Sequence, residues 1–285
     1  MSGETQQQTI GGPAVIKGVG LHTGRKCRAT FLPAQPNAGI TFVRVDLPGK
    51  PAFEARVENV VDVVRGTTLG MGEARVYTIE HILSALNGLG IDNMTIEMDD
   101  NEPPVLDGSA KGFIDAIRSA GIVEQDSPKH FFTVSTPVEY SSHQTVIRIE
   151  PSDQFEIECT VDYNHPMVSN QTLVYRRDQD YEKEIAPART FCFDYEIEAL
   201  RKNGLAKGGS LDNAIVVGPE GIYNQGEALR FPDEFVRHKV LDLMGDLMLL
   251  GSPIRAKIIA KRCGHGHNIK FLKQLIQEKK IPLNA

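Results

Sequence analysis

The 285-residue sequence lacks the features that identify several large classes of protein. It has no stretch of 18 or more uninterrupted apolar residues, and its first residues, MSGETQQQTIGG, lack the apolar region of a signal peptide. It also has no long run of basic residues, and its formal net charge is −6. We therefore expect a cytoplasmic protein with no transmembrane segment and no nucleic-acid partner.

Cysteine is scarce and scattered. The four cysteines, Cys27, Cys159, Cys192 and Cys263, form no CxxC pair, which argues against a zinc knuckle and against a disulfide framework. Reduced thiols in the cytoplasm are the interpretation that fits best. The HExxH motif of a common class of zinc peptidases is also absent.

Two units of similar plan follow one another along the chain. The hydrophobic content of 41% is ordinary for a globular protein with a core, and the length suits one large or two medium domains. Short β-like segments fill the first third, and a helical pattern, a strand and a second helical pattern follow. The expected strands are 27–34, 39–45, 53–61 and 93–99, and the expected helices are 78–90 and 109–121, with Ser109 as the N-cap of the second helix.

The polar segment 123–130 separates this unit from a new β-rich run, so we place the domain boundary there, between domains 1–125 and 130–285. The second unit repeats the order of the first. A β-rich run from 131 leads to a helix at 235–251, a strand at 255–263 and a helix at 267–280. The sequence thus predicts an α+β fold in which His81 and His238 lie on equivalent helices and face one another across a shared cleft.

The segment FVRHKVLDLMGDL, residues 235–247, has the pattern of a buried helix but carries His238, Asp242 and Asp246 at a spacing of four. Side chains at this spacing form one stripe along a helix. One interpretation is the solvated edge of an amphipathic helix, and another is a His–Asp hydrogen bond that satisfies one carboxylate. A third is a divalent metal, because an imidazole and a carboxylate at i and i+4 can converge on one zinc ion.

Six motifs in order resemble those of UDP-3-O-acyl-N-acetylglucosamine deacetylase, the zinc amidase family of lipid A biosynthesis. They are GVGLHTG (18–24), TIEHILSALNGLGIDN (78–93), EPPVLDGSA (102–110), ARTF (188–191), FVRHKVLDLMGDL (235–247) and the Gly264-His265 pair. The resemblance spans nearly the whole chain. It implies two similar two-layer sandwich domains, each a β-sheet packed against a pair of helices, with the active site between the domains.

The resemblance also implies a hydrolytic zinc site. It assigns metal binding to His81, His238 and Asp242, which agrees with the three protein ligands of catalytic zinc sites. For His81 taken alone, a hydrogen-bonded residue of the core is the alternative. The resemblance makes Glu80 the general base that takes a proton from water. A solvated glutamate near the start of a helix is the alternative interpretation of Glu80.

Three further residues complete the catalytic group that the resemblance implies. The Thr190 hydroxyl is expected to stabilise the negative charge that develops on the carbonyl oxygen. A protonated His265 contributes to the same stabilisation and donates a proton to the leaving amine. Asp246 pairs with His265 and holds it charged, because an anionic neighbour raises the pKa of a histidine.

The substrate-binding residues are expected around this group. Lys239 is expected to meet the diphosphate or ribose of a UDP group, with a solvated lysine as the alternative. Phe191 and Phe193 resemble aromatic residues that the family places around its substrate, and His22 is a further candidate unless the glycines of its motif mark only a turn. The resemblance implies an acyl-chain passage, for which ordinary helix core is an equally good explanation, lined by Ile197, Leu200, Ala206, Ala214 and Val216.

Two positions depart from the family pattern. Cys192 replaces a frequent glycine after ARTF, which can alter the wall of the site. In the run 263–268, CGHGHN, the family commonly has SGH followed by x-L-N, so this chain carries a second histidine, His267. We choose His265 as the acid because the Gly264-His265 pair matches the GH of the family and because glycines flank this histidine on both sides. His267 instead lies next to Asn268, which we expect to cap the following helix.

The function expected from these residues is zinc-dependent hydrolysis of the N-acetyl group of a UDP-linked, 3-O-acylated N-acetylglucosamine by a monomer. The partner is thus a small-molecule UDP-acyl-sugar and the cofactor is Zn²⁺. Another zinc amidase or peptidase is an alternative among enzymes. A metal-binding or nucleotide-sugar-binding module without catalysis is an alternative of another class, and it predicts that Glu80 and His265 are dispensable.

Overall fold

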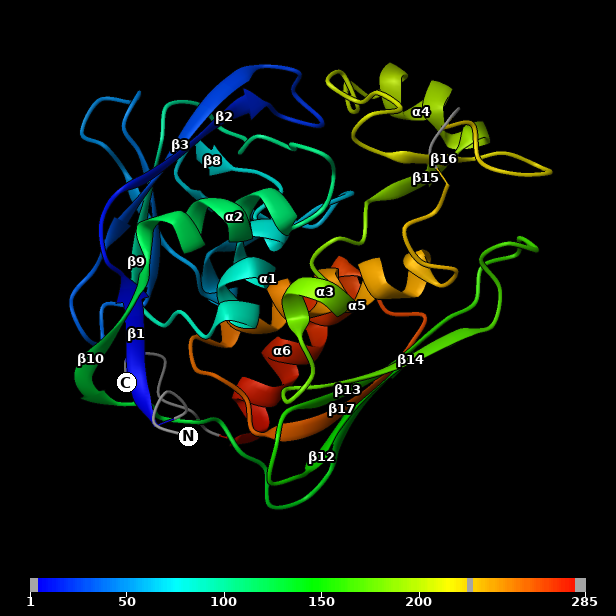
Figure 1. Ribbon diagram of the computed structural model, residues 1–285. Coiled ribbons are helices and arrows are strands. Elements are labelled where there is room, and N and C mark those ends of the chain that lie inside the picture. Colours follow the sequence, from blue (N-terminus) through cyan, green and yellow to red (C-terminus); the bar gives the residue numbers. More distant parts are fainter. Residues whose placement is uncertain (1–4, 225–227, 280–285) are drawn as a thin grey trace.

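Two five-stranded β-sheets frame the molecule, and helices fill the space between them (Figure 1). The structure is a computed structural model that describes residues 5–224 and 228–279. The sheet at the left of Figure 1 comes from the first half of the chain, and the sheet at the lower right comes from the second half. Each sheet carries a pair of helices on its inner face, so the expected α+β fold of two similar two-layer units is confirmed.

The first sheet has the strand order β2-β3-β9-β4-β5. Its inner face is apolar because alternate strand residues point to one side, as in β3, where Cys27, Ala29 and Phe31 are buried. Glycines end both covering helices: Gly90 caps the first with a left-handed backbone, and Gly121 caps the second. The elements are β2 (Ala14–Val19), β3 (Lys26–Pro33), β4 (Ile40–Arg44), β5 (Ala52–Glu54), β9 (Met94–Met98), α1 (Glu80–Leu89) and α2 (Lys111–Ala120).

The second sheet repeats this plan with the order β11-β12-β17-β13-β14. In each sheet the strand that follows the first helix enters the centre, where it runs antiparallel to the second strand of its unit and parallel to the third. The repeat that the sequence only suggests is therefore present in the topology. The elements are β11 (Val138–Ser142), β12 (Thr145–Pro151), β13 (Glu156–Val161), β14 (Gln171–Arg176), β17 (Ala256–Lys261), α5 (Glu234–Leu247) and α6 (His265–Lys279).

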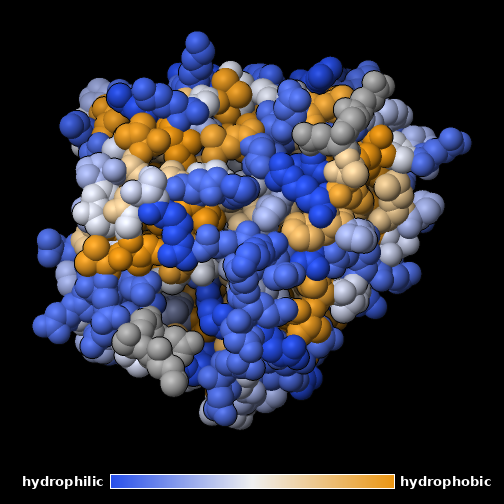
Figure 2. All heavy atoms as spheres, viewed as in Figure 1, coloured by the Kyte–Doolittle hydropathy of each residue, from blue (hydrophilic) through white to orange (hydrophobic). Residues whose placement is uncertain are grey.

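Smaller elements extend each unit. A three-stranded sheet precedes α1, and the parallel pair β15–β16, with α4 between its strands, precedes α5. Figure 2 shows apolar side chains at the surface over the part of the molecule that contains α4, β15 and β16. These elements are β6 (Val60–Asp62), β7 (Thr68–Met71), β8 (Ala74–Val76), α3 (Tyr181–Glu184), β15 (Phe191–Phe193), α4 (Ile197–Lys202), β16 (Ile215–Val217) and the 3₁₀ helices Val57–Asn59, Asp194–Glu196 and Met248–Leu250.

The polar segment 123–130 has more structure than a linker between domains. Most of it forms β10 (Ile122–Pro128), which pairs antiparallel with β1 (Gln6–Ile10) at the edge of the first unit. The pairing satisfies the backbone of a segment whose side chains are mostly polar and therefore give no apolar alternation. The division into domains 1–125 and 130–285 remains a proposal, and residues 1–4 and 280–285 at the ends of these ranges lie outside the described residues.

Three local expectations are wrong. The expected strand 53–61 is interrupted by a 3₁₀ turn at Val57–Asn59, because the chain leaves the first sheet at Glu54 and enters the three-stranded sheet at Val60. The N-cap of α2 is Ala110, although the Ser109 hydroxyl accepts a hydrogen bond from the Lys111 amide at 3.2 Å. Helix α6 begins at His265, two residues before the expected start, so Asn268 lies inside the helix and does not cap it.

Helices α1 and α5 cross at close range in the middle of the molecule. A Cβ atom at Gly245 of α5 would overlap the carbonyl oxygen of Glu80 in α1, so glycine sets the distance between the two helices. The Asn87 side-chain amide donates a hydrogen bond to the Met244 carbonyl at 2.9 Å. This crossing brings the residues at the start of α1 next to the polar stripe of α5.

Candidate metal centre and active site

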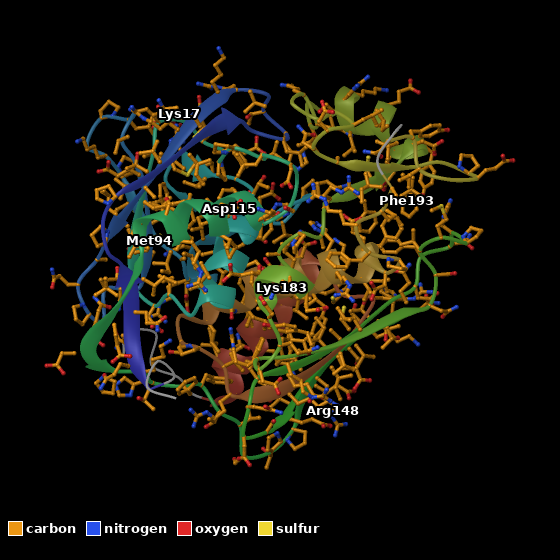
Figure 3. All side chains as sticks on the ribbon, in the orientation of Figure 1. Lys17, Met94, Asp115, Arg148, Lys183 and Phe193 are labelled. Atoms are coloured by element: carbon orange, nitrogen blue, oxygen red, sulfur yellow. The ribbon has the colours of Figure 1, made fainter. Side chains whose placement is uncertain are left out.

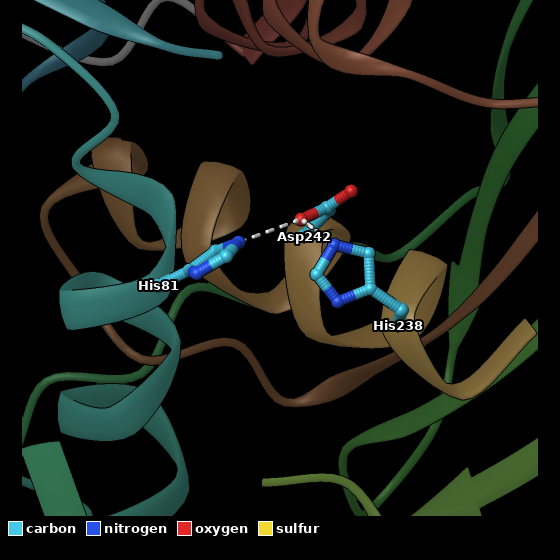
Figure 4. Close-up of side chains that lie close together, drawn as sticks. All are labelled: His81, His238 and Asp242. Carbon is cyan, nitrogen blue, oxygen red and sulfur yellow. Dashed lines mark ion pairs between the residues drawn. The ribbon is translucent and has the colours of Figure 1, made fainter. Parts of the chain in front are cut away.

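Three buried side chains from α1 and α5 converge at this crossing (Figure 4). Asp242 Oδ1 lies 3.3 Å from His238 Nε2 and 3.7 Å from His81 Nε2. One ligand atom from each of the three residues lies within 4.8 Å of the other two. The polar stripe of α5 is therefore not a solvated edge, and the structure brings together the three residues that the sequence predicts as metal ligands.

The protonation of the two histidines suits metal binding. Burial lowers the pKa of His81 to about 4 and that of His238 to about 3, so both rings are neutral at pH 7. His238 Nδ1 donates to the Ala188 carbonyl at 3.1 Å, which leaves the Nε2 lone pair facing Asp242. A metal-binding histidine commonly has such a second hydrogen bond, because it fixes the tautomer and the orientation of the ring. The donor set fits a divalent metal.

Asp242 is ionised although it is buried. Burial alone would raise its pKa, but His238 and Lys239 hold it well below its usual value. Lys239 Nζ donates to Asp242 Oδ2 at 2.6 Å and lies 5.4 Å from the centre of the Phe191 ring. Asp242 and Tyr163 raise the pKa of Lys239, so the ammonium stays charged despite burial. The structure thus places the predicted phosphate-binding lysine beside Asp242, a candidate metal ligand.

Glu80 lies beside the three ligands at the first position of α1. Its Oε2 accepts a hydrogen bond from the Thr67 amide at 2.9 Å, and its Oε1 lies 3.8 Å from His265 Nε2. Burial raises the pKa of Glu80 to about 7, and the nearby carboxylates of Asp242 and Asp246 act in the same direction. A carboxylate with a pKa near neutrality is well suited to accept and release a proton. Glu80 is not a solvated glutamate, since its side chain is 3% exposed.

Asp246 binds the ring of His265, as the sequence predicts. Its Oδ2 lies 2.8 Å from His265 Nδ1, and the opposite ring atom, Nε2, lies 3.9 Å from Asp242 Oδ2. Burial alone would lower the pKa of His265, but the carboxylates of Asp246, Glu80 and Asp242 raise it to about 10. His265 is therefore a cation at neutral pH, aimed at the space beside Glu80 and Asp242.

Two residues that orient Asp246 were not predicted from the sequence to do so. The Thr67 hydroxyl donates to Asp246 Oδ1 at 2.6 Å, and the Asn268 side-chain amide donates to Asp246 Oδ2 at 2.8 Å. Thr67 comes from the loop before β7, and Asn268 comes from the first turn of α6. No motif marks Thr67. For Asn268 the available signal is its spacing of three from His265, which places both on one face of the helix.

His267 lies outside the catalytic group. Its Nδ1 lies 3.0 Å from the Tyr140 hydroxyl, on the β11 side of α6. Successive residues near the start of a helix point in different directions, so His265 and His267 cannot both face α5. This placement supports the choice of His265 over His267.

The ARTF motif is held by a buried ion pair. Arg189 Nε donates to Glu234 Oε1 at 2.9 Å, and the side chains of Arg189 and Glu234 are 2% and 0% exposed. The next residue, Thr190, is fixed on both sides, since its amide donates to Gly108 and its carbonyl accepts from Ile215, each at 2.8 Å. Thr190 is half-buried at the start of the strand that leads to the aromatic residues.

The aromatic residues of β15 have different surroundings. The Phe191 ring packs edge to face on Phe235 at 5.0 Å and faces the His238 ring at 6.2 Å, so it borders the metal ligands. Phe193, labelled beside the β15–β16 pair in Figure 3, is 4% exposed and belongs to a small separate core with Phe235. Of the two predicted aromatics, Phe191 is the one beside the metal ligands.

The residues predicted for the acyl passage lie in and around the β15–β16 unit. A groove of ≈ 360 Å³ runs beside α4, with Leu200 as the one predicted residue in its lining, and its other lining residues are Val64, Arg65, Tyr195, Glu196, Ala199, Asn203 and Leu205. Val216 pairs with Cys192 across the two strands. Ile197, Ala206 and Ala214 are half-buried outside the lining of this groove.

His22 joins the first unit to the α4 region. Its Nδ1 accepts from the Ala206 amide at 3.4 Å, its carbonyl accepts from the Lys207 amide at 3.2 Å, and its Nε2 lies 3.2 Å from the Arg65 carbonyl. The motif GVGLHTG therefore does more than form a turn. It docks against the loop that follows α4, beside the groove.

A second groove, of ≈ 500 Å³, was not predicted from the sequence. Its lining is mostly polar and consists of Asp162, Tyr163, Asn164, His165, Pro166, Ser169 and Arg262. The Tyr163 ring lies 5.8 Å from the Phe191 ring, which in turn borders His238 and Lys239. Phe191 therefore lies between a residue of this groove and the candidate metal centre. The run DYNHP after β13 is the signal that could have drawn attention to it, because it places an aromatic among polar turn residues.

Within residues 5–224 and 228–279, none of the helices combines the length and the apolar character that crossing a bilayer requires. The longest helix, α6, is amphipathic and packs on the second sheet.

Comparison with known proteins gives one consistent result. The family model of UDP-3-O-acyl N-acetylglycosamine deacetylase (LpxC) matches residues 7–277. A UDP-3-O-acyl-N-acetylglucosamine deacetylase of Anaeromyxobacter dehalogenans is 45% identical over 273 residues, which cover 95% of this chain and 88% of that protein. A protein of the same name from Methylococcus capsulatus is 43% identical over 277 residues, which cover 96% and 91% of the two chains.

A bifunctional enzyme LpxC/FabZ of Chlorobaculum tepidum is 42% identical over 298 residues. The match covers 94% of this chain but 64% of that longer protein. The matched region of the family model contains every residue placed in the site above, and the chain therefore belongs to the UDP-3-O-acyl N-acetylglycosamine deacetylase family.

Proposed function

We propose that the protein hydrolyses the N-acetyl group of UDP-3-O-acyl-N-acetylglucosamine to give UDP-3-O-acyl-glucosamine and acetate, the deacetylation step of lipid A biosynthesis. The observation that carries the proposal is the convergence of His81, His238 and Asp242 with Glu80 and His265 beside them. Relatives at 43–45% identity over almost the whole chain carry the name of this activity.

We propose Zn²⁺ as the metal, because two imidazoles and one carboxylate are a common ligand set of catalytic zinc sites. When bound, the ion would polarise the amide carbonyl. It would also lower the pKa of a coordinated water to about 7. The neutral histidines and the ionised Asp242 need no change of protonation to receive it.

Glu80 is the general base. Its carboxylate takes the proton of the attacking water, and the Thr67 amide holds the carboxylate in place at 2.9 Å. Because burial raises the pKa of Glu80 to about 7, the carboxylate binds a proton more strongly than an exposed glutamate does.

His265 is the general acid. The water attack leaves the amide nitrogen without the proton it needs to depart as an amine, and the imidazolium Nε2 supplies that proton. Asp246 keeps the other ring nitrogen, Nδ1, protonated and oriented through the contact at 2.8 Å. The Thr190 hydroxyl donates to the oxygen on which negative charge develops.

The two grooves give the substrate two directions away from the acetamide. We propose that the polar groove of ≈ 500 Å³ receives the uridine diphosphate, since Tyr163 offers a ring for stacking and Arg262 offers a guanidinium for phosphate. Lys239, whose ammonium lies 5.4 Å from the centre of the Phe191 ring, contributes a second cation. The acyl chain runs toward Phe191, Phe193 and His22 and along the proposed passage, Ile197, Leu200, Ala206, Ala214 and Val216, in the part of the molecule with apolar surface in Figure 2.

We further propose that the two domains, 1–125 and 130–285, act together in a monomer, since one chain supplies ligands from both halves. A cytoplasmic location is proposed because the four cysteines are free, as is usual in a reducing compartment.

The test of the function is acetate release from UDP-3-O-acyl-N-acetylglucosamine by the purified protein, before and after a chelator and after Zn²⁺ is restored. We expect turnover that is lost with the metal and recovered with it. A metal-dependent binding module would bind the substrate without releasing acetate, and that result would reject the proposal.

A further inference from the structure

Two cysteines that have no part in the proposed mechanism face each other at the 262–264 loop, which leads into His265 of α6. Cys159 lies in the centre of β13 and is fully buried, and Cys263 follows the end of β17 and is half-buried. Their sulfur atoms are 3.9 Å apart, close enough for one thiol to hydrogen-bond to the other. The other two cysteines, Cys27 and Cys192, are free and form no such pair.

The pair is tied directly to the general acid. A single residue, Gly264, separates Cys263 from His265, and the space around Gly264 is open. On the other side, Cys159 is held in place by two ladders, opposite Leu173 of β14 and Ala260 of β17. Any approach of the two sulfurs must therefore come mainly from Cys263 and the 262–264 loop that leads into His265.

The surroundings of Cys263 favour the thiolate. The hydrogen bond from Cys159 lowers the pKa of Cys263, and the ammonium of Lys239 acts in the same direction against the effect of burial. The same hydrogen bond and burial raise the pKa of Cys159 well above its usual value. One partner is thus suited to react first and the other to follow as a thiol, which is the arrangement of reactive and resolving cysteines in redox sensors.

We propose that Cys159 and Cys263 are a modification site at which a peroxide forms a reversible disulfide. The Cys263 thiolate attacks one oxygen of hydrogen peroxide, breaking the O–O bond and giving a sulfenic acid and hydroxide. The Cys159 thiol then attacks the sulfenic sulfur, forming the S–S bond and releasing water. Two thiols and one peroxide give one disulfide and two waters, and an external dithiol reverses the reaction.

The disulfide moves His265, the proposed general acid, away from Asp246. Its bond length of about 2.05 Å requires the sulfurs to approach from the 3.9 Å that separates them here, and the sheet fixes Cys159, so the 262–264 loop shifts. His265 depends on a contact of 2.8 Å between its Nδ1 and Asp246 Oδ2, which a displaced loop does not preserve. Oxidation therefore lowers turnover by up to the contribution of a general acid, about 10²–10⁴-fold. This consequence rests on the proposed function, whereas formation of the disulfide does not.

The experiment treats the metal-loaded protein with hydrogen peroxide and follows intact mass, peptide mapping, metal content and acetate release in the same sample. We expect loss of two hydrogen atoms, a peptide that joins Cys159 to Cys263, retained metal, and turnover at least about tenfold lower that dithiothreitol restores. Cys263→Ser, which replaces the thiol with a hydroxyl of similar size, should keep its basal turnover and lose the cross-link and the reversible inhibition. Cys192→Ser should still form the cross-link.

Three results would overturn the proposal. One is a wild-type protein in which peroxide produces no Cys159–Cys263 link, whether or not single cysteines are oxidised further. The second is a fully cross-linked protein with unchanged turnover. The third is a Cys263→Ser variant that peroxide inhibits to the same extent as wild type. Failure of the proposed function is recognised separately, because untreated protein would then release no acetate while mass and peptide mapping still decide whether the disulfide forms.

Discussion

In the proposed mechanism, single residues of α5 divide between metal binding and proton transfer. His238 and Asp242 face His81, whereas Asp246, one turn further along, faces His265 and makes no contact with the two ligand histidines among the described interactions. The spacing of four therefore serves two sites with one helix. Its polar residues are buried because each has a charged or hydrogen-bonding partner, as buried charges require.

Replacing Glu80 with glutamine tests its proposed role as general base independently of metal binding. The amide retains the size of the side chain and can hydrogen-bond to water, but it cannot take a proton. We expect Glu80→Gln to bind metal normally and to lower kcat by about 10²–10⁴-fold. Metal analysis and steady-state kinetics on the same preparation check this, and a variant within a few-fold of wild type with metal intact would exclude the role.

The two histidines in the first turn of α6, His265 and His267, give a matched comparison. His265→Ala should lower kcat/KM by about 10²-fold or more and remove the high-pH limb of the rate profile, because that limb reports loss of the acid's proton. His267→Ala should change kcat/KM little, since the His267 ring contacts Tyr140 and not the catalytic group. The reverse outcome would assign the acid to His267.

Asp246→Asn tests whether Asp246 raises the pKa of His265. The carboxylates around His265 raise its pKa to about 10, so the acid stays protonated up to that pH and activity falls above it. Removing the Asp246 anion lowers the pKa of His265, and the high-pH limb should move to lower pH. An unmoved limb in this variant would show that Asp246 does not set the proton affinity of His265.

At this scale, sequence alone could predict which residues the structure brings together as candidate ligands and as a candidate acid–base pair, because their motifs stand in a recognisable order. It could not identify Thr67 or the Tyr163–Arg262 groove. Thr67 reaches Asp246 across 179 positions of the chain, and no local pattern of residues encodes such a contact. The residues of the proposed acyl passage could not be assigned from sequence in the same way, because apolar side chains at helical spacing are also typical of ordinary core.

Among the elements, α1 and α5 determine whether the site exists. Their close crossing depends on Gly245, where a side chain would overlap the Glu80 carbonyl. The sequence predicts both helices and their equivalence, and the shared strand order of the two sheets supports it. The sequence does not predict β10, because that strand has no apolar alternation of its own. Its register is set by pairing with β1, more than a hundred residues earlier.

Alanine substitutions at two helical glycines separate two effects on stability. One is the close crossing of α1 and α5, and the other is the helix propensity of the residue. Gly to Ala inside a helix ordinarily stabilises a protein by about 0.5–1 kcal/mol. Gly266→Ala in α6 should follow that rule, since the nearest atom to its new Cβ is 3.6 Å away. Gly245→Ala should instead destabilise by about 1–3 kcal/mol, as overpacked cores do, and should weaken metal binding. Denaturant unfolding checks both, and equal effects of the two substitutions would contradict this account of the crossing.

Across the whole molecule, the proposed metal ligands connect the two halves of the chain. His81 comes from the first unit, and His238 and Asp242 come from the second. A ligand that binds only the folded state raises stability by about 4 kcal/mol at a thousandfold excess over its Kd. The metal should therefore stabilise the protein as a whole and not one unit alone.

Chelation should accordingly lower the Tm of the wild-type protein, and restored Zn²⁺ should raise it again. The control is His81→Ala, whose Tm should respond much less to either treatment because one ligand is missing. Scanning calorimetry measures both proteins. A wild-type Tm that stays constant when bound metal is removed would show that the two halves are held together without any contribution from the metal.

The central claim is that two histidines and one aspartate hold the catalytic metal. X-ray absorption of the zinc-loaded protein tests it most directly, because zinc–nitrogen and zinc–oxygen distances differ from zinc–sulfur distances. The account predicts only nitrogen and oxygen ligands at about 2.0–2.2 Å, with the histidine signal reduced in both His81→Ala and His238→Ala. A sulfur ligand at about 2.3 Å would instead place the metal on a cysteine and contradict the assignment.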